Sequence, residues 1–392
     1  MDNKITKVVF LSNYFNHHQK PFADELFKRL GKGYKFIETG VMSEERKKLG
    51  WGMENIPEYV IPAVVLRAHL QEGMALIDDA DVVIIGSAPE FLIKNRLKDN
   101  KLVFRYSERP LKKGIELLKY PVRFYRWRKN NPMKSNLYLL CASAYASADY
   151  AKFGLFKNRA YKWAYFPTVK EYESIEELIQ NKKTHSIVWT ARFIDWKHPE
   201  MAVELAKRLK SAGYDFVLNM IGTGPMVDEI KKSITENGLD ENVCVLGSMK
   251  PEAVREYMEG SEIYIFTSDR QEGWGAVLNE SMNSACAVVA SHAAGSTRFL
   301  IEHGKNGLVF KSESLDSLYE NVKLLLDNPQ KRKELSKNAY ESMVNEWNAK
   351  NAADRFVTLS ECILSGEKYA NPFKKGVCSK AERLKDSWRK NG

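Results

Sequence analysis

The sequence predicts an α/β protein made of two consecutive domains of similar size, each built on a parallel sheet. Its 392 residues suit two domains of ordinary size. A hydrophobic share of 44% with 28% charged residues is enough for sizeable cores and excludes disordered and collagen-like chains. Short apolar runs alternate with longer amphipathic stretches along the whole chain, which is typical of parallel βα units.

The expected strands form two series, with helical stretches between them. The first series covers residues 8–12, 35–38, 81–86, 102–106, 137–141 and 161–166. The second series covers residues 186–192, 216–222, 243–247, 263–268 and 287–291. Two such domains imply a crevice lined by the loops at the carboxyl ends of the strands, and we expect the active site there.

These series divide the chain into four parts. Residues 1–168 form the expected N-terminal domain and residues 185–350 the C-terminal domain. Between them, residues 169–184 are strongly polar with few core candidates, which predicts an interdomain linker. Residues 351–392 are expected to form a C-terminal helix, which could cross back to the N-terminal domain, and a basic tail.

Composition also predicts the compartment. No apolar run approaches the roughly 18 residues needed to span a bilayer, and the first residues lack a signal-peptide pattern. We therefore expect a cytoplasmic protein. The five cysteines are scattered without a C-x-x-C pair, which favours buried free thiols.

Positive charge is concentrated in the first half of the chain. Residues 1–170 hold 30 Lys+Arg and 17 Asp+Glu, whereas residues 171–392 hold 30 and 33. Basic and aromatic residues interleave over 109–134, where an anionic membrane surface could bind, and the protein would then be peripheral on the inner face of the plasma membrane. A solvated basic face is the alternative, and Pro121 is expected to break the helix. A nucleic-acid partner is not expected, because no nucleic-acid-binding motif accompanies the charge.

The segment after the expected strand 263–268 carries the strongest chemical signal. Small residues at Gly273 and Gly275 let a ligand approach backbone amides, and the following helix directs unpaired N–H groups toward an anion. A diphosphate would fit there. The carboxylates of Glu272 and Glu280 could accept hydrogen bonds from sugar or ribose hydroxyls.

Two cations follow the first strand of the C-terminal domain. Arg192 and Lys197 are expected to face the same crevice as Glu272, where they could neutralise the charge of a leaving phosphate. Gly222 and Gly224 lack the third glycine of a dinucleotide fingerprint and favour a tight strand-to-helix turn.

The motifs R-x4-K, G-x-G-P, V-x-V-L-G, E-G-W-G-x4-E, A-V-V-A-S and N-G-L-V-F follow one another over residues 186–310. In this order they resemble the donor-binding domain of retaining glycosyltransferase family 4. The resemblance implies the GT-B fold, in which two Rossmann-like domains face each other across a cleft. It also implies a nucleotide-diphosphate sugar as donor and no metal or other cofactor for transfer.

Carried onto this sequence, the resemblance implies a donor site in the C-terminal domain. Arg192 and Lys197 would bind the diphosphate, Glu280 the ribose, and Glu272 the hydroxyls of the donor sugar. Backbone N–H groups would hold the donor sugar and phosphates at Gly273, Trp274, Gly275, Ala276 and Val277. The base pocket would be lined by Val245, Leu246 and Gly247, and the turn at Gly222 and Gly224 is counted with the donor-binding residues. Trp274 stands where the family usually has Phe.

The N-terminal half departs from the family pattern. Where relatives commonly have a glycine-rich loop, Asn16, His17, His18 and Gln19 offer contacts to an acceptor or phosphate, or they cap the next helix with Asn16 as N-cap. Many relatives have a histidine after the fourth strand of this domain. Here Ser107, Glu108 and Arg109 follow that strand, and we assign a site role to Glu108 while leaving Arg109 open.

Two metal patterns are discounted. Asp79 and Asp81 satisfy D-x-D, yet they directly precede an expected buried strand and favour a helix end and turn. The four histidines considered as ligands have no metal-binding spacing: His185, His198, His292 and His303.

Together these features predict a retaining glycosyltransferase that moves a sugar from a nucleotide-diphosphate sugar to an acceptor hydroxyl. The basic N-terminal domain suggests a lipid-linked acceptor in the synthesis of capsule, exopolysaccharide or another cell-surface glycan. The alternatives are a nucleotide-sugar epimerase, a phosphorylase, or a catalytically silent GT-B scaffold that binds membrane or partner proteins.

Overall fold

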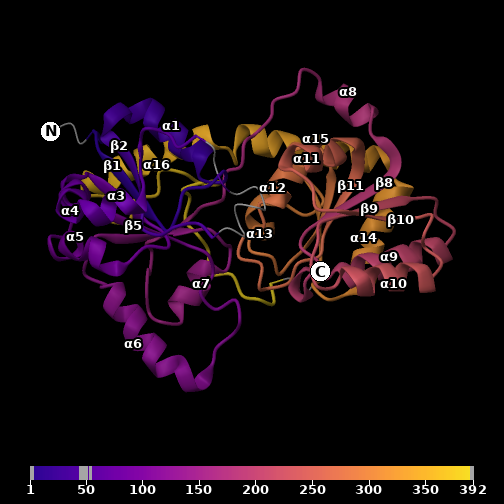
Figure 1. The fold of residues 1–392 in the computed structure, drawn as a ribbon, viewed down its shortest axis with the longest axis horizontal. Helices are drawn as coiled ribbons and strands as arrows, with labels where there is room; N and C mark the ends of the chain where they lie inside the picture. The colour runs from indigo at the N-terminus through magenta and orange to yellow at the C-terminus, as the bar shows by residue number, and fades with distance from the viewer. Residues whose placement is uncertain (1–3, 44–51, 53–54, 389–392) are drawn as a thin grey trace. The chain divides into compact units, whose positions relative to one another are not determined.

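The computed structural model describes residues 4–43, 52 and 55–388. These residues form two compact units. The N-terminal unit comprises Met1–Thr168 and Trp347–Lys385, and the C-terminal unit comprises Val169–Glu346 and Asp386–Gly392. Each unit contains one parallel sheet with helices around it (Figure 1).

The N-terminal unit has a seven-stranded sheet in the order β3-β2-β1-β4-β5-β6-β7, and every neighbouring pair is parallel. The chain winds outward from β1 in both directions, so the switch point lies between β1 and β4. Loops that follow these strands meet at one edge of the sheet. The strands are β1 (Val8–Ser12), β2 (Tyr34–Glu38), β3 (Val60–Ile61), β4 (Val82–Ile85), β5 (Val103–Ser107), β6 (Leu137–Cys141) and β7 (Ala160–Lys162).

The C-terminal unit has a six-stranded sheet in the order β10-β9-β8-β11-β12-β13, again parallel throughout. Its switch point lies between β8 and β11. A continuous apolar core covers this sheet, as the run of buried Val, Ile and Leu predicts. The strands are β8 (Lys183–Thr190), β9 (Val217–Ile221), β10 (Val243–Gly247), β11 (Ser261–Phe266), β12 (Ala287–Ser291) and β13 (Leu308–Phe310).

Two parallel α/β sheets confirm the predicted fold class, with local differences. The expected strand 161–166 ends at Lys162, because Trp163 and Phe166 leave the ladder and pack edge-to-face with ring centroids 5.1 Å apart. The short strands β3 and β13 were absent from the expected series. Helices of the N-terminal unit are α1 (Lys20–Leu30), α3 (Ala63–Ala68), α4 (Leu70–Asp79), α5 (Lys94–Lys98), α6 (Tyr120–Asn130), α7 (Ala146–Ala151) and α16 (Ala349–Leu364).

Helices also surround the second sheet. Short 3₁₀ turns include η3 (Glu90–Ile93), η4 (Leu117–Lys119) and η5 (Asp195–Lys197). None of the helices among the described residues is long and apolar enough to cross a membrane. Helices of the C-terminal unit are α8 (Ile175–Gln180), α9 (Pro199–Ser211), α10 (Val227–Glu236), α11 (Pro251–Gly260), α12 (Val277–Asn283), α13 (Thr297–Leu300), α14 (Leu315–Asp327) and α15 (Pro329–Asn345).

The end of the chain packs on the N-terminal unit. Helix α16 lies against α1, where the rings of Phe22 and Phe356 are 6.1 Å apart edge to face. Beyond α16, Lys380 pairs with Tyr161 in an antiparallel bridge at the edge of β7. The expectation of a basic appendage is therefore wrong for this part of the tail, because backbone pairing and burial of Cys378 fix it to the sheet edge.

Three smaller predictions have different outcomes. Pro121 does not break a helix: it lies in the first turn of α6, where a proline's missing N–H needs no partner. Asp79 ends α4 and Asp81 accepts backbone N–H bonds from Thr6 and Lys7 at 2.8 Å, which confirms a helix end and turn. The five cysteines are free thiols, and three of them are buried.

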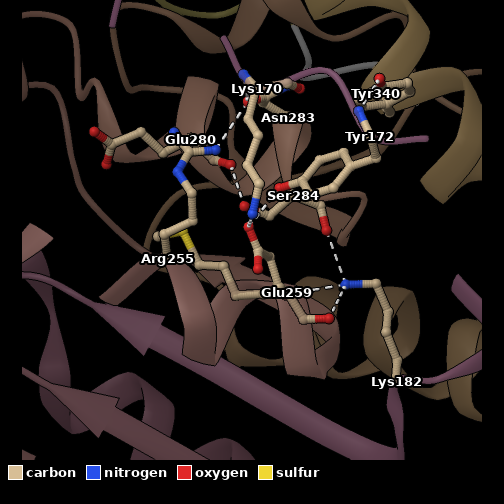
Figure 2. A network of polar contacts seen from close by, with 10 residues as sticks. Lys170, Tyr172, Lys182, Arg255, Glu259, Glu280, Asn283, Ser284 and Tyr340 are labelled. Atoms are coloured by element: carbon tan, nitrogen blue, oxygen red, sulfur yellow. Dashed lines mark hydrogen bonds and ion pairs between the residues drawn. The ribbon is translucent and has the colours of Figure 1, made fainter. Parts of the chain in front are cut away.

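The expected linker is bound tightly to the C-terminal unit (Figure 2). Lys170 exchanges two hydrogen bonds with Asn283, at 2.8 and 3.0 Å, and its ammonium pairs with Glu259 at 2.8 Å. Tyr172 donates to the same Glu259 carboxylate at 2.6 Å. Lys182 is buried and donates to three backbone carbonyls at 2.8 to 3.0 Å. Residues 170–182 are therefore part of the C-terminal unit rather than a loosely attached polar connection.

Candidate functional site

Loops at the switch point of the C-terminal sheet bring together two of the predicted site residues. Lys197 ends the 3₁₀ turn η5 after β8, and Glu272 lies in the loop after the neighbouring strand β11. Their side chains form an ion pair, although 75 residues separate them in sequence. Both side chains are largely buried, with 12% and 13% of their surface exposed. A cation and a carboxylate are thus held at the place where parallel sheets usually bind ligands.

Backbone hydrogen bonds fix these two loops to each other. The Asp269 N–H donates to the Trp196 carbonyl at 3.0 Å, and the Glu272 N–H donates to the Asp269 carbonyl at 3.1 Å. The Thr267 hydroxyl donates to the carbonyl of Lys197 itself. The position of the Lys197–Glu272 pair is therefore set by the backbone as well as by its charges.

Arg192 lies at the open side of the same loop. Its side chain is exposed, and the guanidinium carbon lies 5.7 Å from the centre of the Trp196 ring. An aromatic face attracts a cation and limits its freedom. Arg192 and Lys197 thus belong to one loop, with the arginine accessible to solvent and the lysine held by Glu272.

Glu280 lies in the first turn of α12. Burial raises the pKa of its carboxyl to about 7, while the positive charge of Arg255 acts in the opposite direction. Arg255, which lies on α11, donates a hydrogen bond at 2.8 Å to Asn283, which lies on α12 with Glu280 (Figure 2). Glu280 therefore changes charge close to neutral pH, which is unusual for a carboxylate and typical of functional sites.

Gly222 and Gly224 support the loop that carries Arg192. A Cβ atom on Gly222 would lie 1.9 Å from the Ala191 carbonyl oxygen, and one on Gly224 would lie 2.4 Å from the Phe193 carbonyl oxygen. Both glycines have positive φ. The predicted tight turn is confirmed, and the glycines are needed for close backbone approach.

Residues at the end of β10 lie beside this turn. Val245 packs against the core of the C-terminal unit, while Leu246 and Gly247 are partly exposed. The Gly247 carbonyl accepts a hydrogen bond from the Gly222 N–H at 2.8 Å. The predicted base pocket and the glycine turn are therefore neighbours.

The segment Gly273–Val277 leads into α12, with Ala276 at the N-cap position. The Trp274 side chain is fully buried, and its indole N–H donates to Asn279 at 2.9 Å. The buried Trp274 ring packs inside the unit, so the predicted contact to a ligand at this position would involve its backbone N–H group. Gly275 has φ +90°, and a Cβ there would lie 2.4 Å from the Phe266 ring.

His198, next to Lys197, forms a charged cluster that the sequence did not indicate. Its Nδ1 lies 2.7 Å from Glu200, and its Nε2 lies 3.8 Å from Asp269. The nearby carboxylates of Asp269 and then Glu200 raise the pKa of His198 to about 10. Ligand atoms of His198, Asp269 and Glu313 lie within 4.8 Å of one another, the spacing of a metal site. When His198 is protonated, its ion pair with Asp269 connects the two loops.

The first loop of the N-terminal unit holds two partly buried histidines, His17 and His18. Asn16 accepts the His18 N–H at 3.0 Å, which forms a turn, and α1 begins only at Lys20 with Gln19 as N-cap. The prediction of Asn16 as N-cap is therefore wrong. Burial, followed by the nearby charge of His17, lowers the pKa of His18 to about 3, and burial also lowers the pKa of His17. Both imidazoles are neutral at physiological pH.

Glu108 belongs to the same group of side chains. Tyr165 donates to its carboxylate at 2.6 Å, and the Tyr165 ring stacks on His18 with centroids 5.9 Å apart. Lys112 lies 3.3 Å from the other carboxylate oxygen. Tyr165 lies three residues after the end of β7 and was not among the predicted site residues. The sequence signal that could have identified it is a tyrosine hydroxyl just after the last strand of the N-terminal sheet.

Arg109 points away from this group. Its guanidinium forms a buried ion pair with Asp149, in which both side chains are 1% exposed, and the Asp149 carboxylate also accepts the Leu111 N–H at 3.1 Å. The Tyr145 ring covers the guanidinium at 4.5 Å. Arg109 therefore stabilises the loop, and Glu108 alone of the two remains a candidate site residue.

Known proteins resemble part of this chain in sequence. The model of the family described as Glycosyl transferases group 1 matches residues 171–342. An alpha-D-kanosaminyltransferase of Streptomyces kanamyceticus is 29% identical over 153 residues, which are 39% of each chain. An N-acetylgalactosamine-N,N'-diacetylbacillosaminyl-diphospho-undecaprenol 4-alpha-N-acetylgalactosaminyltransferase of Campylobacter jejuni is 30% identical over 152 residues, 38% of this chain and 40% of that protein. The chain thus spans about two fifths of the length of these relatives.

Solved structures extend the likeness to the whole fold. The Anabaena protein Alr3699/HepE, solved in complex with UDP, has a TM-score of 0.67 at 14% identity, over 90% of this chain and 98% of that one. This likeness confirms the GT-B type of fold. Residues 171–342, which carry the Lys197–Glu272 pair, match the family described as Glycosyl transferases group 1.

Proposed function

We propose that this protein is a glycosyltransferase that moves a sugar from a nucleoside-diphosphate sugar to an acceptor hydroxyl, with retention at the anomeric carbon. The observation that carries the proposal is the Lys197–Glu272 pair at the switch point of the C-terminal sheet, within the part of the chain that matches the family. A cation there suits a phosphate, and a carboxylate suits a sugar hydroxyl.

In this proposal the C-terminal unit binds the donor. Arg192 and Lys197 bind the diphosphate, and binding releases Lys197 from Glu272 so that the carboxylate can accept hydroxyls of the sugar. Glu280, once ionised, accepts the ribose hydroxyls. The two cations neutralise charge that grows on the leaving phosphate, so they contribute more in the transition state than in the ground state.

Proton transfer needs no strong base in this reaction. In a front-face displacement the leaving phosphate oxygen itself accepts the proton of the acceptor hydroxyl. The chain then provides position and charge, and no metal is required in the proposed reaction. Glu108 and Tyr165, beside the neutral His18, are proposed to bind the acceptor, because a carboxylate, a hydroxyl and an imidazole all form hydrogen bonds with sugar hydroxyls.

The acceptor is proposed to be a lipid-linked glycan intermediate of the cell surface. The name of the Campylobacter jejuni relative describes a diphospho-undecaprenol acceptor, and another relative, 29% identical over 126 residues, is an amylovoran biosynthesis glycosyltransferase of Erwinia amylovora. These names support the acceptor class without identifying the sugar.

A thermal-shift series with nucleoside diphosphates and nucleotide sugars tests the donor site. A selective rise in Tm that both Arg192→Ala and Glu280→Ala abolish would support the proposal. Lys207→Ala, an exposed lysine on α9 of the same unit, is the matched control and should keep the full rise. No response to any nucleotide would sink the donor assignment and favour a silent scaffold.

Product analysis separates the enzyme classes. A glycosyltransferase releases the nucleoside diphosphate only when an acceptor is present, and NMR of the product would show the anomeric configuration of the donor sugar. An epimerised nucleotide sugar, or a sugar phosphate formed from inorganic phosphate, would instead identify an epimerase or a phosphorylase.

A further inference from the structure

Helix α6 of the N-terminal unit presents two opposite faces with different environments. One face is formed by Tyr120, Phe124 and Trp127, which share a side because they are four and three residues apart. All three rings contact Phe153, and the Trp127 ring stacks on it at 5.6 Å with an interplanar angle of 11°. The aromatic residues that suggested membrane contact from the sequence therefore attach the helix to its own unit.

The opposite face is apolar and exposed. It is formed by Leu118 in η4 and by Val122 and Tyr125 in α6. These residues are also four and three positions apart, and each comes two positions before a residue of the packed face, which places them on the other side of the helix. Their exposed fractions are 98%, 70% and 69%. No residue of α6 is buried, and the helix lies at the outer edge of its unit (Figure 1). Such a row of large apolar side chains is costly in water unless another surface covers it.

Uncompensated positive charge lies on this same face. Arg126 is four residues after Val122, and Lys129 is four residues after Tyr125. Both are exposed, and neither has an ion-pair partner among the described residues, 4–43, 52 and 55–388. Lys119 and Arg123 each follow one residue after an apolar residue of this face, Leu118 and Val122. Both pair with the same carboxylate, that of Glu116, at 3.1 Å each. From residue 112 to 134 the sequence has eight Lys+Arg and one Glu.

We propose that this face of η4 and α6 docks the protein on an anionic lipid bilayer, with Leu118, Val122 and Tyr125 inserted at the interface and Arg126 and Lys129 on the headgroups. The pattern is that of an interfacial helix, which lies in the plane of the membrane with its apolar side inward. An acidic lipid surface satisfies both features at once, because it takes up apolar side chains and attracts cations. The inference does not depend on the proposed reaction.

Sedimentation of the whole chain with vesicles tests the docking face. We expect binding to vesicles of phosphatidylcholine and phosphatidylglycerol, weak binding to phosphatidylcholine alone, and a decrease as salt is added. Arg126→Gln/Lys129→Gln should lower the partition coefficient about 25-fold, since each cation near the surface contributes about fivefold. Val122→Ser/Tyr125→Ser should lower it at least about tenfold.

The matched control is Lys207→Gln/Lys231→Gln, which removes the same charge from exposed positions of the C-terminal unit. It should bind vesicles like the wild type. An equal loss of vesicle binding in this control would mean that only net charge matters. Unchanged vesicle binding of the serine variant would mean that the apolar face does not insert. Either result overturns the proposal, and so does a wild-type protein that does not bind anionic vesicles. Retained Tm in each variant shows that the fold is intact, and a retained nucleotide response shows that the donor site is independent of this face.

Discussion

Lys197 and Glu272 form a largely buried ion pair between the loops that follow β8 and β11. We expect Lys197→Met or Glu272→Leu alone to lower the free energy of unfolding by about 2 kcal/mol, because each leaves a partly buried charge without its partner. The double variant should recover most of this loss, since no buried charge remains.

Urea unfolding of the four proteins measures this double-mutant cycle. The donor site gives a different pattern: all three variants should lose the nucleotide-induced rise in Tm. Strictly additive stability losses would contradict the coupling that the structure shows.

Glu280 should make nucleotide binding depend on pH near neutrality. Its pKa is raised to about 7 by burial, so the carboxylate that accepts ribose hydroxyls forms only as pH rises through that value. Affinity for a nucleoside diphosphate should therefore increase from pH 6 to pH 8 in the wild type. Calorimetric titration of Glu280→Gln should give weaker binding and a flatter profile over the same range.

The same shift affects stability in the opposite sense. A carboxyl whose folded pKa is raised stabilises the fold below its ordinary value of 4.5, and this contribution is lost as pH rises through about 7. Glu280→Gln should thus be more stable than the wild type at pH 8, by about 2 kcal/mol, and closer to it at pH 5. Equal differences at both pH values would mean that the carboxyl titrates normally.

His198 should stabilise the fold over the whole neutral range. Its pKa is raised from 6.5 to about 10 by Asp269 and Glu200, so its contribution is fully present below pH 6.5 and is lost as pH rises through about 10. His198 has φ +52°, which asparagine tolerates, so His198→Asn removes the charge without backbone strain. We expect this variant to lose about 1 kcal/mol at pH 7 and less at pH 10.5.

Equilibrium unfolding at the two pH values checks the loss. Added Zn²⁺ provides a further comparison: a protonated His198 predicts no rise in Tm at pH 7 that depends on this residue. A Zn²⁺-dependent rise that His198→Asn abolishes would show that the cluster with Asp269 and Glu313 binds metal instead.

Lys182 should hold the segment 170–182 on the C-terminal unit. Its buried ammonium donates to the carbonyls of Met258, Glu259 and Ser284, and Lys182→Met leaves all three without this donor. We expect a loss of about 3 kcal/mol in the free energy of unfolding and faster proteolysis within 170–182. The exposed neighbour gives the control, since Lys183→Met should be cut at the wild-type rate.

Much of the fold followed from local sequence pattern. The strands 8–12, 137–141, 243–247 and 287–291 have the predicted bounds, because each is an apolar run bounded by polar residues or turn formers. Short β3 escaped notice because two residues give no periodicity. The prediction that Pro121 breaks a helix is wrong because a proline in the first turn and one in the interior look alike in sequence until the helix boundary is known.

Within the candidate site, motif order identified Arg192, Lys197, Glu272 and Glu280 as residues of one family pattern. It did not reveal that Lys197 pairs with Glu272, that the Trp274 ring is buried, or that His198 lies between Glu200 and Asp269. Each of these depends on which loops become neighbours in the sheet, and sheet order is not written in any local window.

The sequence by itself determined the alternation of strands and helices, the two-sheet architecture and the family motifs, since these depend on hydrophobic periodicity and on residues close together in the chain. Only the tertiary structure decided which charges pair, which carboxyl and imidazole groups have shifted pKa values, and which face of α6 is exposed. The physical reason is that burial and ion pairing depend on distances between atoms. Those distances are fixed when segments far apart in sequence pack against one another.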